Sequence, residues 1–184
     1  MPAMRLDRFR NPHFRRGRPR AVEALWIAVA GLLFSTWLPG SAWRRSLLRM
    51  FGARIGANVV IKPRVRVKFP WKLAVGDHSW IGESVWIDNL DQVTIGAHCC
   101  ISQGAYFCTG NHRWDVQTFD LVVRPILLED ECWVGAGVRL APGTRLGKGV
   151  VLAMGLQVSG DVDPATVSVP GTAEIRRFAR PERE

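Results

Sequence analysis

The sequence predicts an all-β solenoid, a parallel β-helix assembled from six-residue repeats. From residue 55 onward an aliphatic or aromatic residue returns at every sixth position, often followed by a glycine, with a small or β-branched residue four positions after it. A helix of 3.6 residues per turn would scatter these positions over all its faces, whereas a strand keeps positions i, i+4 and i+6 on one side. The period therefore predicts short strands joined by tight turns, with the aliphatic residues stacked inside.

The repeat is regular enough to assign the inward-facing positions one by one. Three hexapeptides would close one triangular coil of about eighteen residues. We expect the glycines after the strands to turn the chain with positive φ. We interpret two-residue slips at Leu73–Val75 and Val93–Ile95 as small bulges at corners. The predicted inward positions are Ile55, Ile61, Val67, Val75, Ile81, Ile87, Ile95, Ile101, Phe107, Leu128, Val134, Leu140, Leu146, Leu152 and Val158.

The chain of 184 residues is long enough for one domain with a buried core, and its 47% hydrophobic and 22% charged residues are typical of folded proteins. We expect a basic arm over residues 1–20 and an apolar, amphipathic helical segment over residues 21–54. The β-helix should span residues 55–160, with a loop at 109–125. Residues 161–184 form a tail.

The net charge of +9 belongs to the N-terminal segment alone. Residues 1–54 hold eleven arginines and two acidic residues, whereas residues 55–184 hold fourteen basic and fourteen acidic residues. A nucleic-acid-binding domain should carry its basic residues on the folded face, so we expect no nucleic-acid partner. The four cysteines form no CxxC pair, which is typical of reduced thiols in a cytoplasmic protein.

Residues 24–43 run twenty positions without a charge, and Pro39 and Gly40 end their strongly apolar part. Four interpretations stay open: a membrane-spanning helix, a signal peptide, helices lying on a membrane surface, and helices packed on the body or on a partner subunit. In the third, residues 1–50 would meet the inner face of the membrane, because arginines on both flanks attract anionic headgroups.

The segments "WRRSLLRMFGARIG", "IKPRVRVKFPWKLAVGDHSWIGESVWIDNL", "VTIGAHCCISQGAYFCTGNHRWD" and "CWVGAGVRLAPGTRLGKGVVLAMG" resemble the hexapeptide-repeat acyltransferase superfamily. They are most like the colanic acid and polysaccharide-biosynthesis O-acetyltransferases, which are related to galactoside and maltose acetyltransferases. The resemblance covers roughly residues 20–175. It implies a left-handed β-helix, a homotrimer with each active site between two subunits, acetyl-CoA as donor, and a sugar hydroxyl as acceptor.

The stretch "CTGNHRWDVQTFD", residues 108–120, interrupts the repeat. An insertion in a solenoid leaves the coil as a loop, and loops on rigid scaffolds commonly carry sites. His112 in this loop matches the family's catalytic histidine. A neutral imidazole can take the proton of the attacking hydroxyl, so the acetyl group could pass directly between two bound substrates. The alternative is a solvated surface histidine.

Five residues are candidates for binding the acceptor. Asp88 and Asn89 match a region that binds the acceptor in the family, although Asx residues also favour corner turns. Asn111, Trp114 and Asp115 flank His112 in the loop. Trp114 could stack on a sugar or fasten the loop, and Asp115 could orient His112 or be solvated.

The candidate donor site is less regular. Where the family has serine, lysine and a GNPA turn, this chain has Leu156, Gly160 and the residues 170–173. A basic tail could still meet the phosphates of CoA. The predicted donor-binding residues are Trp133, Gly135, Ala136, Ala153, Gly155, Ser159, Arg176 and Arg177.

Two other functions compete with the acetyltransferase. The altered donor site favours a β-helix that has lost catalysis and serves as a scaffold or partner subunit. His78, His98 and His112 suggest a metal-dependent hydratase that resembles the γ-carbonic anhydrases. His78 and His112 nearly fit the first spacing of that family's three histidines, but Gln117 stands where the third ligand should be. We therefore expect no metal.

Overall fold

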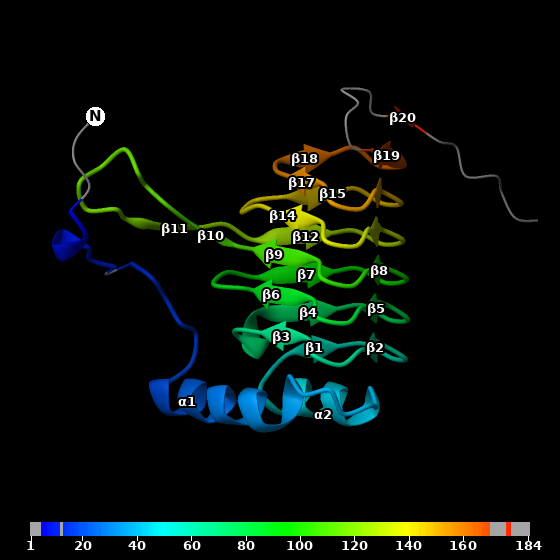
Figure 1. Cartoon of the computed structure of the whole chain (residues 1–184), viewed down its shortest axis with the longest axis horizontal. Coiled ribbons are helices and arrows are strands. Elements are labelled where there is room, and N and C mark those ends of the chain that lie inside the picture. Colours follow the sequence, from blue (N-terminus) through cyan, green and yellow to red (C-terminus); the bar gives the residue numbers. More distant parts are fainter. Residues whose placement is uncertain (1–4, 12, 170–175, 178–184) are drawn as a thin grey trace, which may run out of the picture.

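The computed structural model describes residues 5–11, 13–169 and 176–177 of the chain. Short strands wind into a solenoid with three parallel sheets along its length, and helices cover its first coil (Figure 1). The predicted parallel β-helix is confirmed. Residues 1–4, 170–175 and 178–184, which include much of the expected tail, lie outside the described residues.

Each of the first five coils contributes one strand to each of the three sheets, and the last adds β18 and β19 to the first and second. The first sheet contains β1 (Arg54–Ile55), β4 (Leu73–Val75), β7 (Val93–Ile95), β12 (Ile126–Leu128), β15 (Arg145–Leu146) and β18 (Asp161–Val162). The second contains β2 (Val60–Ile61), β5 (Trp80–Ile81), β8 (Cys100–Ile101), β13 (Trp133–Val134), β16 (Val151–Leu152), β19 (Thr166–Ser168) and the antiparallel β20 (Arg176–Arg177). The third contains β3 (Arg66–Val67), β6 (Trp86–Asp88), β9 (Tyr106–Cys108), β14 (Arg139–Leu140) and β17 (Gln157–Val158).

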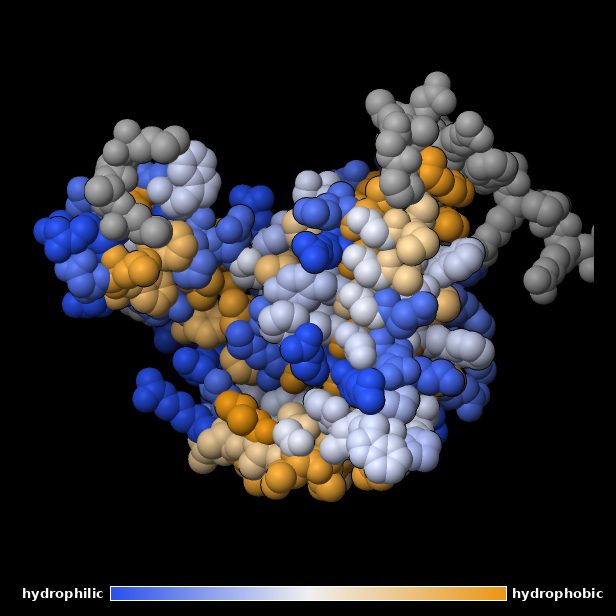
Figure 2. Space-filling model, viewed as in Figure 1, coloured by the Kyte–Doolittle hydropathy of each residue, from blue (hydrophilic) through white to orange (hydrophobic). Residues whose placement is uncertain are grey.

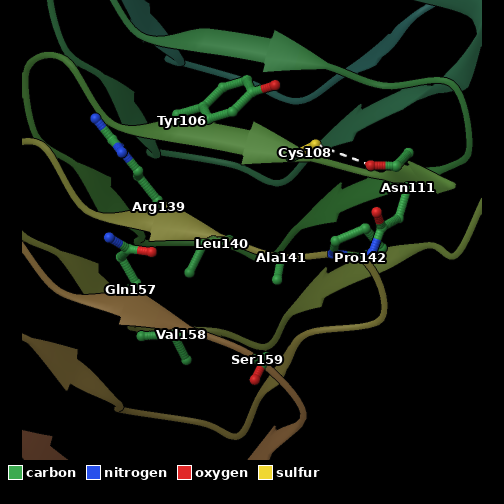
Figure 3. A pocket seen from close by; sticks show the side chains of 11 residues that line it. Tyr106, Cys108, Asn111, Arg139, Leu140, Ala141, Pro142, Gln157, Val158 and Ser159 are labelled. Atoms are coloured by element: carbon green, nitrogen blue, oxygen red, sulfur yellow. Dashed lines mark hydrogen bonds between the residues drawn. The ribbon is translucent and has the colours of Figure 1, made fainter. Parts of the chain in front are cut away.

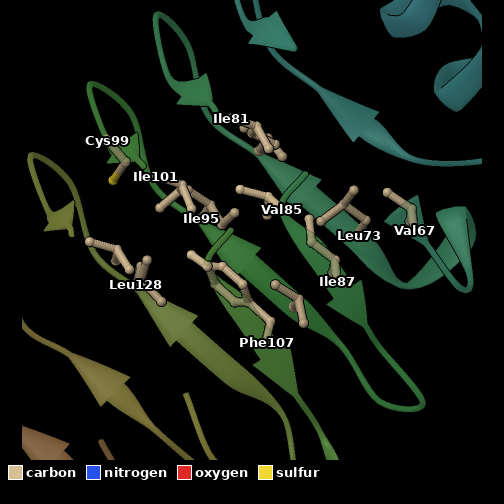
Figure 4. Packing of buried hydrophobic residues seen from close by; sticks show 14 of the residues in the cluster. Val67, Leu73, Ile81, Val85, Ile87, Ile95, Cys99, Ile101, Phe107 and Leu128 are labelled. Carbon is tan, nitrogen blue, oxygen red and sulfur yellow. The ribbon is translucent and has the colours of Figure 1, made fainter. Parts of the chain in front are cut away.

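The core is a stack of aliphatic ladders inside these sheets (Figure 4). Neighbouring strands pair in register, so that Ile61, Ile81 and Ile101 lie one above the other. Fourteen of the fifteen predicted inward positions are buried, and Val158 is partly buried against the same core. The solenoid continues beyond residue 160, because β18 and β19 still pair with the coil below them.

The role predicted for the glycines after the strands was wrong. None of these glycines has positive φ; that conformation falls two residues later, for example at His78. Gly76 is required for a different reason: a Cβ on it would lie 2.5 Å from the backbone nitrogen of Ala97 and 2.6 Å from the carbonyl carbon of Gly96. The hydrogen-bonded coils are too close at this corner to admit any side chain.

Extra residues leave the solenoid at one corner, between the third and first sheets. Leu73–Val75 and Val93–Ile95 are three-residue strands with both ends buried, so the slips lie before them and not within them. The first corner segment forms the short helix η3 (Pro70–Lys72). One coil later the same corner holds residues 89–92, and the next passage between β9 and β12 carries the long insertion.

The N-terminal segment contains η1 (Leu6–Arg8), α1 (Arg20–Val29), the π-helical η2 (Ala30–Phe34) and α2 (Ala42–Met50). Trp26, Phe34 and Leu48 are buried against the first coil. The indole nitrogen of Trp26 donates a hydrogen bond to the carbonyl of Val67 at 2.9 Å. No helix among the described residues combines the length and the apolar character that crossing a bilayer requires.

Arg44 fixes the turn between η2 and α2. Its buried guanidinium donates hydrogen bonds to four main-chain carbonyls, those of Phe34, Thr36, Leu38 and Gly40. These carbonyls lie at and after the C-terminal end of η2, where main-chain oxygens have no partner within the helix. The carbonyl of Thr36 also accepts a hydrogen bond from the main-chain nitrogen of Arg64. We call residues 20–50, which contain α1, η2 and α2, the helical cap. The Arg44 side chain fixes the shape of this cap.

We expect Gly76→Ala to lower the free energy of unfolding by about 3 kcal/mol, the upper range for overpacking, because backbone and not a flexible side chain opposes the new methyl group. Urea unfolding measures the change. Gly31→Ala is the matched control, since a Cβ there meets no atom within 4 Å. Equal midpoints for the two variants would contradict the close approach of the coils.

Candidate active site

The long insertion is a two-stranded hairpin that projects from the corner between the third and first sheets (Figure 1). Its strands are β10 (Gly110–His112) and β11 (Leu121–Val123), and they pair antiparallel with His112 opposite Leu121. The hairpin begins directly after β9, whose three residues are stacked on β6. A rigid coil therefore carries the loop in which we predicted the catalytic histidine.

Contacts within the hairpin fix the imidazole of His112. Its Nδ1 lies 2.8 Å from the main-chain oxygen of Phe119, and its ring stacks on the Phe119 ring with a centroid distance of 4.2 Å and an interplanar angle of 3°. A carbonyl oxygen only accepts hydrogen bonds, so Nδ1 carries the proton in this contact. In the neutral imidazole the lone pair is then on Nε2.

Asp115 does not orient His112. Its carboxylate forms an exposed ion pair with Arg113, at 2.6 Å, while the Phe119 carbonyl takes the orienting position. Trp114 is 62% exposed, which leaves its indole face open to a ligand or a neighbouring subunit. Both side chains belong to the outer end of the hairpin.

A hollow of about 390 Å³ lies between the hairpin and the outer face of the third sheet (Figure 3). Its lining includes Asn111, a predicted acceptor-binding residue, and Ser159, a predicted donor-binding residue. Its other residues are Tyr106, Cys108, Gly110, Arg139, Leu140, Ala141, Pro142, Gln157 and Val158.

Three polar residues of this hollow were missed in the sequence. Tyr106, Arg139 and Gln157 are paired in register on successive coils. Each directly precedes an inward hydrophobic residue, so each points outward. The repeat therefore predicts that these three side chains point outward. It does not predict which outward-facing side chains lie in the same hollow as the loop.

Asp88 lies one coil below the root of the hairpin, beside Cys108. One carboxylate oxygen accepts a hydrogen bond from the Tyr106 hydroxyl at 3.3 Å, and the other lies 3.1 Å from the Lys68 ammonium. Burial, with smaller effects from Cys108 and Asp88, raises the pKa of Tyr106 above its ordinary value. Tyr106 therefore stays a neutral donor at physiological pH.

Asn89 holds the corner from which the hairpin leaves. It is fully buried, and its amide oxygen accepts a hydrogen bond from the main-chain nitrogen of Phe69 at 2.9 Å. Its amide nitrogen donates to the carbonyls of Phe69 and Lys72. These contacts fit the corner role that we considered for Asn89; its contact with an acceptor stays a prediction.

Four of the predicted donor-binding residues gather at a second hollow of about 490 Å³. They are Trp133, Gly135, Ala136 and Ala153, and Gly155 follows in the same turn as Ala153. The Trp133 indole nitrogen donates to the hydroxyl of Ser102 at 3.1 Å. The other residues lining this hollow are Gln103, Val151, Leu152 and Met154. The side chains of Arg176 and Arg177 lie outside what the structure describes.

The hairpin and the second hollow lie at opposite edges of the third sheet. Gly135 and Ala136 are at the corner between β13 and β14, where the second sheet meets the third. The hairpin leaves from the corner where the third sheet meets the first, and Figure 1 shows it on the other side of the solenoid from β5 and β8. Within one chain, His112 therefore does not face the predicted donor hollow.

The histidines proposed for a metal do not converge within the chain. His78 stacks on His98, with ring centroids 5.1 Å apart, at the corner between the first and second sheets. His112 is on the hairpin at another corner. In the part of the chain that the structure describes, no three His, Cys, Asp or Glu residues are grouped to hold a metal ion.

Comparisons with known proteins agree with this architecture. A family model described as the hexapeptide repeat of succinyl-transferase matches residues 125–159. The putative colanic acid biosynthesis acetyltransferase WcaF of Escherichia coli is 41% identical over 173 residues, covering 93% of each chain.

Solved structures show the same fold. A hexapeptide-repeat acetyltransferase of Vibrio cholerae, complexed with acetyl coenzyme A, superimposes with a TM-score of 0.81 at 25% identity, covering 95% of this chain and 97% of that chain. A maltose O-acetyltransferase of Clostridium difficile gives a TM-score of 0.76 at 21% identity, covering 88% of each chain, which bears on the fold alone.

We expect Asn89→Ala to lower the free energy of unfolding by about 3 kcal/mol, because it leaves buried main-chain groups of Phe69 and Lys72 without partners. Chemical denaturation measures the loss. The control is Asn111→Ala, since Asn111 is exposed and its amide oxygen bonds only the next main-chain nitrogen. A loss of similar size in both variants would argue against the structural role of Asn89.

Proposed function

The chain belongs to the hexapeptide-repeat acyltransferase family, and from this premise we propose that it transfers an acetyl group from acetyl-CoA to a saccharide hydroxyl. The geometry of His112 carries the proposal, because its Nδ1 is committed to the Phe119 carbonyl and its Nε2 can act as a base. The acetyl-CoA in the Vibrio cholerae structure supports the donor. The name of the Escherichia coli relative supports polysaccharide or glycan biosynthesis as the setting.

The reaction is a direct transfer in a ternary complex. Nε2 of His112 takes the proton of the sugar hydroxyl as its oxygen attacks the carbonyl carbon of the thioester. When the tetrahedral intermediate collapses, the C–S bond breaks and the sulfur of CoA receives that proton from the imidazolium. The Phe119 carbonyl stabilises the imidazolium in between, because it accepts a hydrogen bond from Nδ1–H.

The hollow beside the hairpin suits a saccharide acceptor. Tyr106, Asn111, Arg139, Gln157 and Ser159 offer hydroxyl, amide and guanidinium groups on one side of the hairpin root. Sugar hydroxyls both donate and accept hydrogen bonds, so such a mixed set can bind several of them. Asp88 supports this wall through Tyr106.

The donor would reach His112 through a neighbouring subunit. The hairpin and the donor hollow lie at the two corners of the third sheet, so a three-fold ring with this sheet facing the axis would bring one corner of each subunit against the other corner of the next. The outer face of the sheet offers an aromatic surface for such contacts, because Trp86 stacks on Tyr106 at 4.7 Å. We therefore propose a homotrimer with shared active sites.

The helical cap carries an apolar surface that is suited to a membrane. Large apolar side chains on and after α1 and η2 are exposed, among them Leu32 (77%) and Trp37 (70%), and Figure 2 shows this surface at the end of the solenoid. Exposed arginines beside this surface, such as Arg18 and Arg20 at the start of α1, would each contribute about 1 kcal/mol near an anionic bilayer. We propose that the enzyme works at the cytoplasmic face of the membrane on a lipid-linked saccharide.

We expect His112→Gln to reduce kcat by about 10²–10⁴-fold, because it removes the general base. The assay follows release of the CoA thiol from acetyl-CoA with a panel of oligosaccharides, and His98→Gln is the control. Calorimetric titration should show that both variants still bind acetyl-CoA. Full turnover by His112→Gln would refute the base; a wild-type protein that binds no acetyl-CoA at millimolar concentration would instead favour the non-catalytic scaffold.

Mixed trimers test the shared site. Ala136→Trp should fill the donor hollow and inactivate the enzyme, as His112→Gln does at the other corner. Co-refolding the two inactive variants should restore part of the activity, because some sites then combine an intact hollow with an intact histidine. If each chain used its own two residues, the mixture would stay inactive.

Vesicle co-sedimentation tests the membrane surface. We expect the wild-type protein to bind vesicles of phosphatidylglycerol and phosphatidylethanolamine and to leave phosphatidylcholine vesicles unbound, because arginine attracts anionic headgroups. The double variant Leu32→Glu/Trp37→Glu should lose binding without unfolding, since both side chains are exposed. Binding that is unchanged in this variant would rule out the apolar surface as the contact.

A further inference from the structure

We propose that residues 5–9, the tip of the N-terminal arm, are part of the active site and position His112. The inference rests on the proposed role of His112 as the base, and it adds a segment that lies about one hundred residues away in the sequence. Figure 1 shows the arm running from α1 along the solenoid to the hairpin. Phe9, Arg8 and Gln117 are the positioning residues.

Main-chain and side-chain hydrogen bonds attach the arm to the outer end of the hairpin. The main-chain nitrogen of Arg5 donates to the carbonyl of Gln117 at 2.9 Å. The guanidinium of Arg8 donates to the side-chain oxygen of Gln117 at 3.0 Å. These bonds link the arm to a hairpin that belongs to no common sheet or helix with it.

The arm also touches the catalytic ring itself. The Phe9 ring lies 5.8 Å from the His112 ring, centroid to centroid, and is tilted by 59°, a usual geometry for an aromatic pair. Phe119 stacks on the same imidazole and its carbonyl holds Nδ1. His112 is thus held by two aromatic rings and one hydrogen bond, and one of the rings comes from the arm.

The part of the arm nearer to α1, residues 14–16, is anchored to the corner below the hairpin. The indole nitrogen of Trp71 donates to the carbonyl of Arg16, and the ammonium of Lys72 donates to the carbonyl of Arg15, both at 2.6 Å. The Phe14 ring packs on Phe69, the residue that Asn89 fixes from inside. The arm therefore spans from the helical cap to the hairpin along one corner.

A hairpin of two short strands needs such support. Arg113, Trp114 and Asp115 at its end are exposed, and an isolated two-stranded hairpin is only marginally stable in water. A general base must stay within hydrogen-bond reach of its proton, and small displacements cost much of the rate. The arm supplies the third segment that the hairpin lacks, so losing it should loosen His112 without disturbing the solenoid.

The test measures the reactivity of each histidine toward diethyl pyrocarbonate, which modifies unprotonated imidazole, by peptide mass spectrometry of the full-length protein. Phe9→Ala should raise the modification rate of His112 several-fold and leave His78 and His98 unchanged, since these two lie at another corner. Phe9→Tyr should restore the wild-type rate. In the thiol-release assay, Phe9→Ala should lower kcat and leave the KM for acetyl-CoA unchanged.

Unchanged reactivity of His112 in Phe9→Ala would overturn the proposal. A uniform rise at His78, His98 and His112 would mean general unfolding. In that case the same measurement on Arg8→Gln, which removes only the exposed hydrogen bond to Gln117, tests the proposal. Because the modification needs no turnover, it tests the arm even if His112→Gln proves fully active. Full activity of His112→Gln would refute His112 as the base, but it would not contradict the contact between Phe9 and His112.

Discussion

The close stacking of successive coils is the constraint on which the rest of this structure depends. Parallel strands in hydrogen-bonded register lie about 4.8 Å apart, so each coil repeats the position of every residue in the coil below. Inside, this spacing stacks Ile61, Ile81 and Ile101 into a ladder. At one corner it leaves no room for a Cβ, which is why Gly76 meets the backbone of Gly96 and Ala97.

The same constraint decides where the chain can carry a functional group. Because the interior and the strands are filled, extra residues leave only at a corner, and here all of them use the corner between the third and first sheets. Asn89 and Thr109 bond main-chain groups at this corner, so the departing hairpin has a fixed root. The position of His112 then depends on the hairpin itself, where the Phe119 carbonyl and the Phe9 ring of the N-terminal arm contact its imidazole.

The arrangement also explains why a single chain looks incomplete. A triangular solenoid presents its corners in different directions, and the hairpin and the predicted donor hollow lie at two of them. A chemistry that needs both groups together favours an assembly, and the helical cap with its exposed apolar residues gives that assembly a distinct end. The proposed trimer with its shared site follows from which corner each group occupies, and the proposed membrane surface from the end of the solenoid that the helices cover.

The sequence by itself determined the solenoid, its inward positions and the place of the interruption, because a period of six is a local property that side-chain alternation in strands converts directly into burial. The family resemblance supplied His112 and the left hand of the coil. Only the tertiary structure decided that Asn89 is buried, that Asp115 pairs with Arg113, and that Tyr106, Arg139 and Gln157 line one hollow. It also decided that Phe9 meets His112. Each of these contacts depends on which coil or segment becomes the neighbour in space. A repeat pattern along the chain does not predict that a loop interrupting the repeat will contact the distant N-terminus.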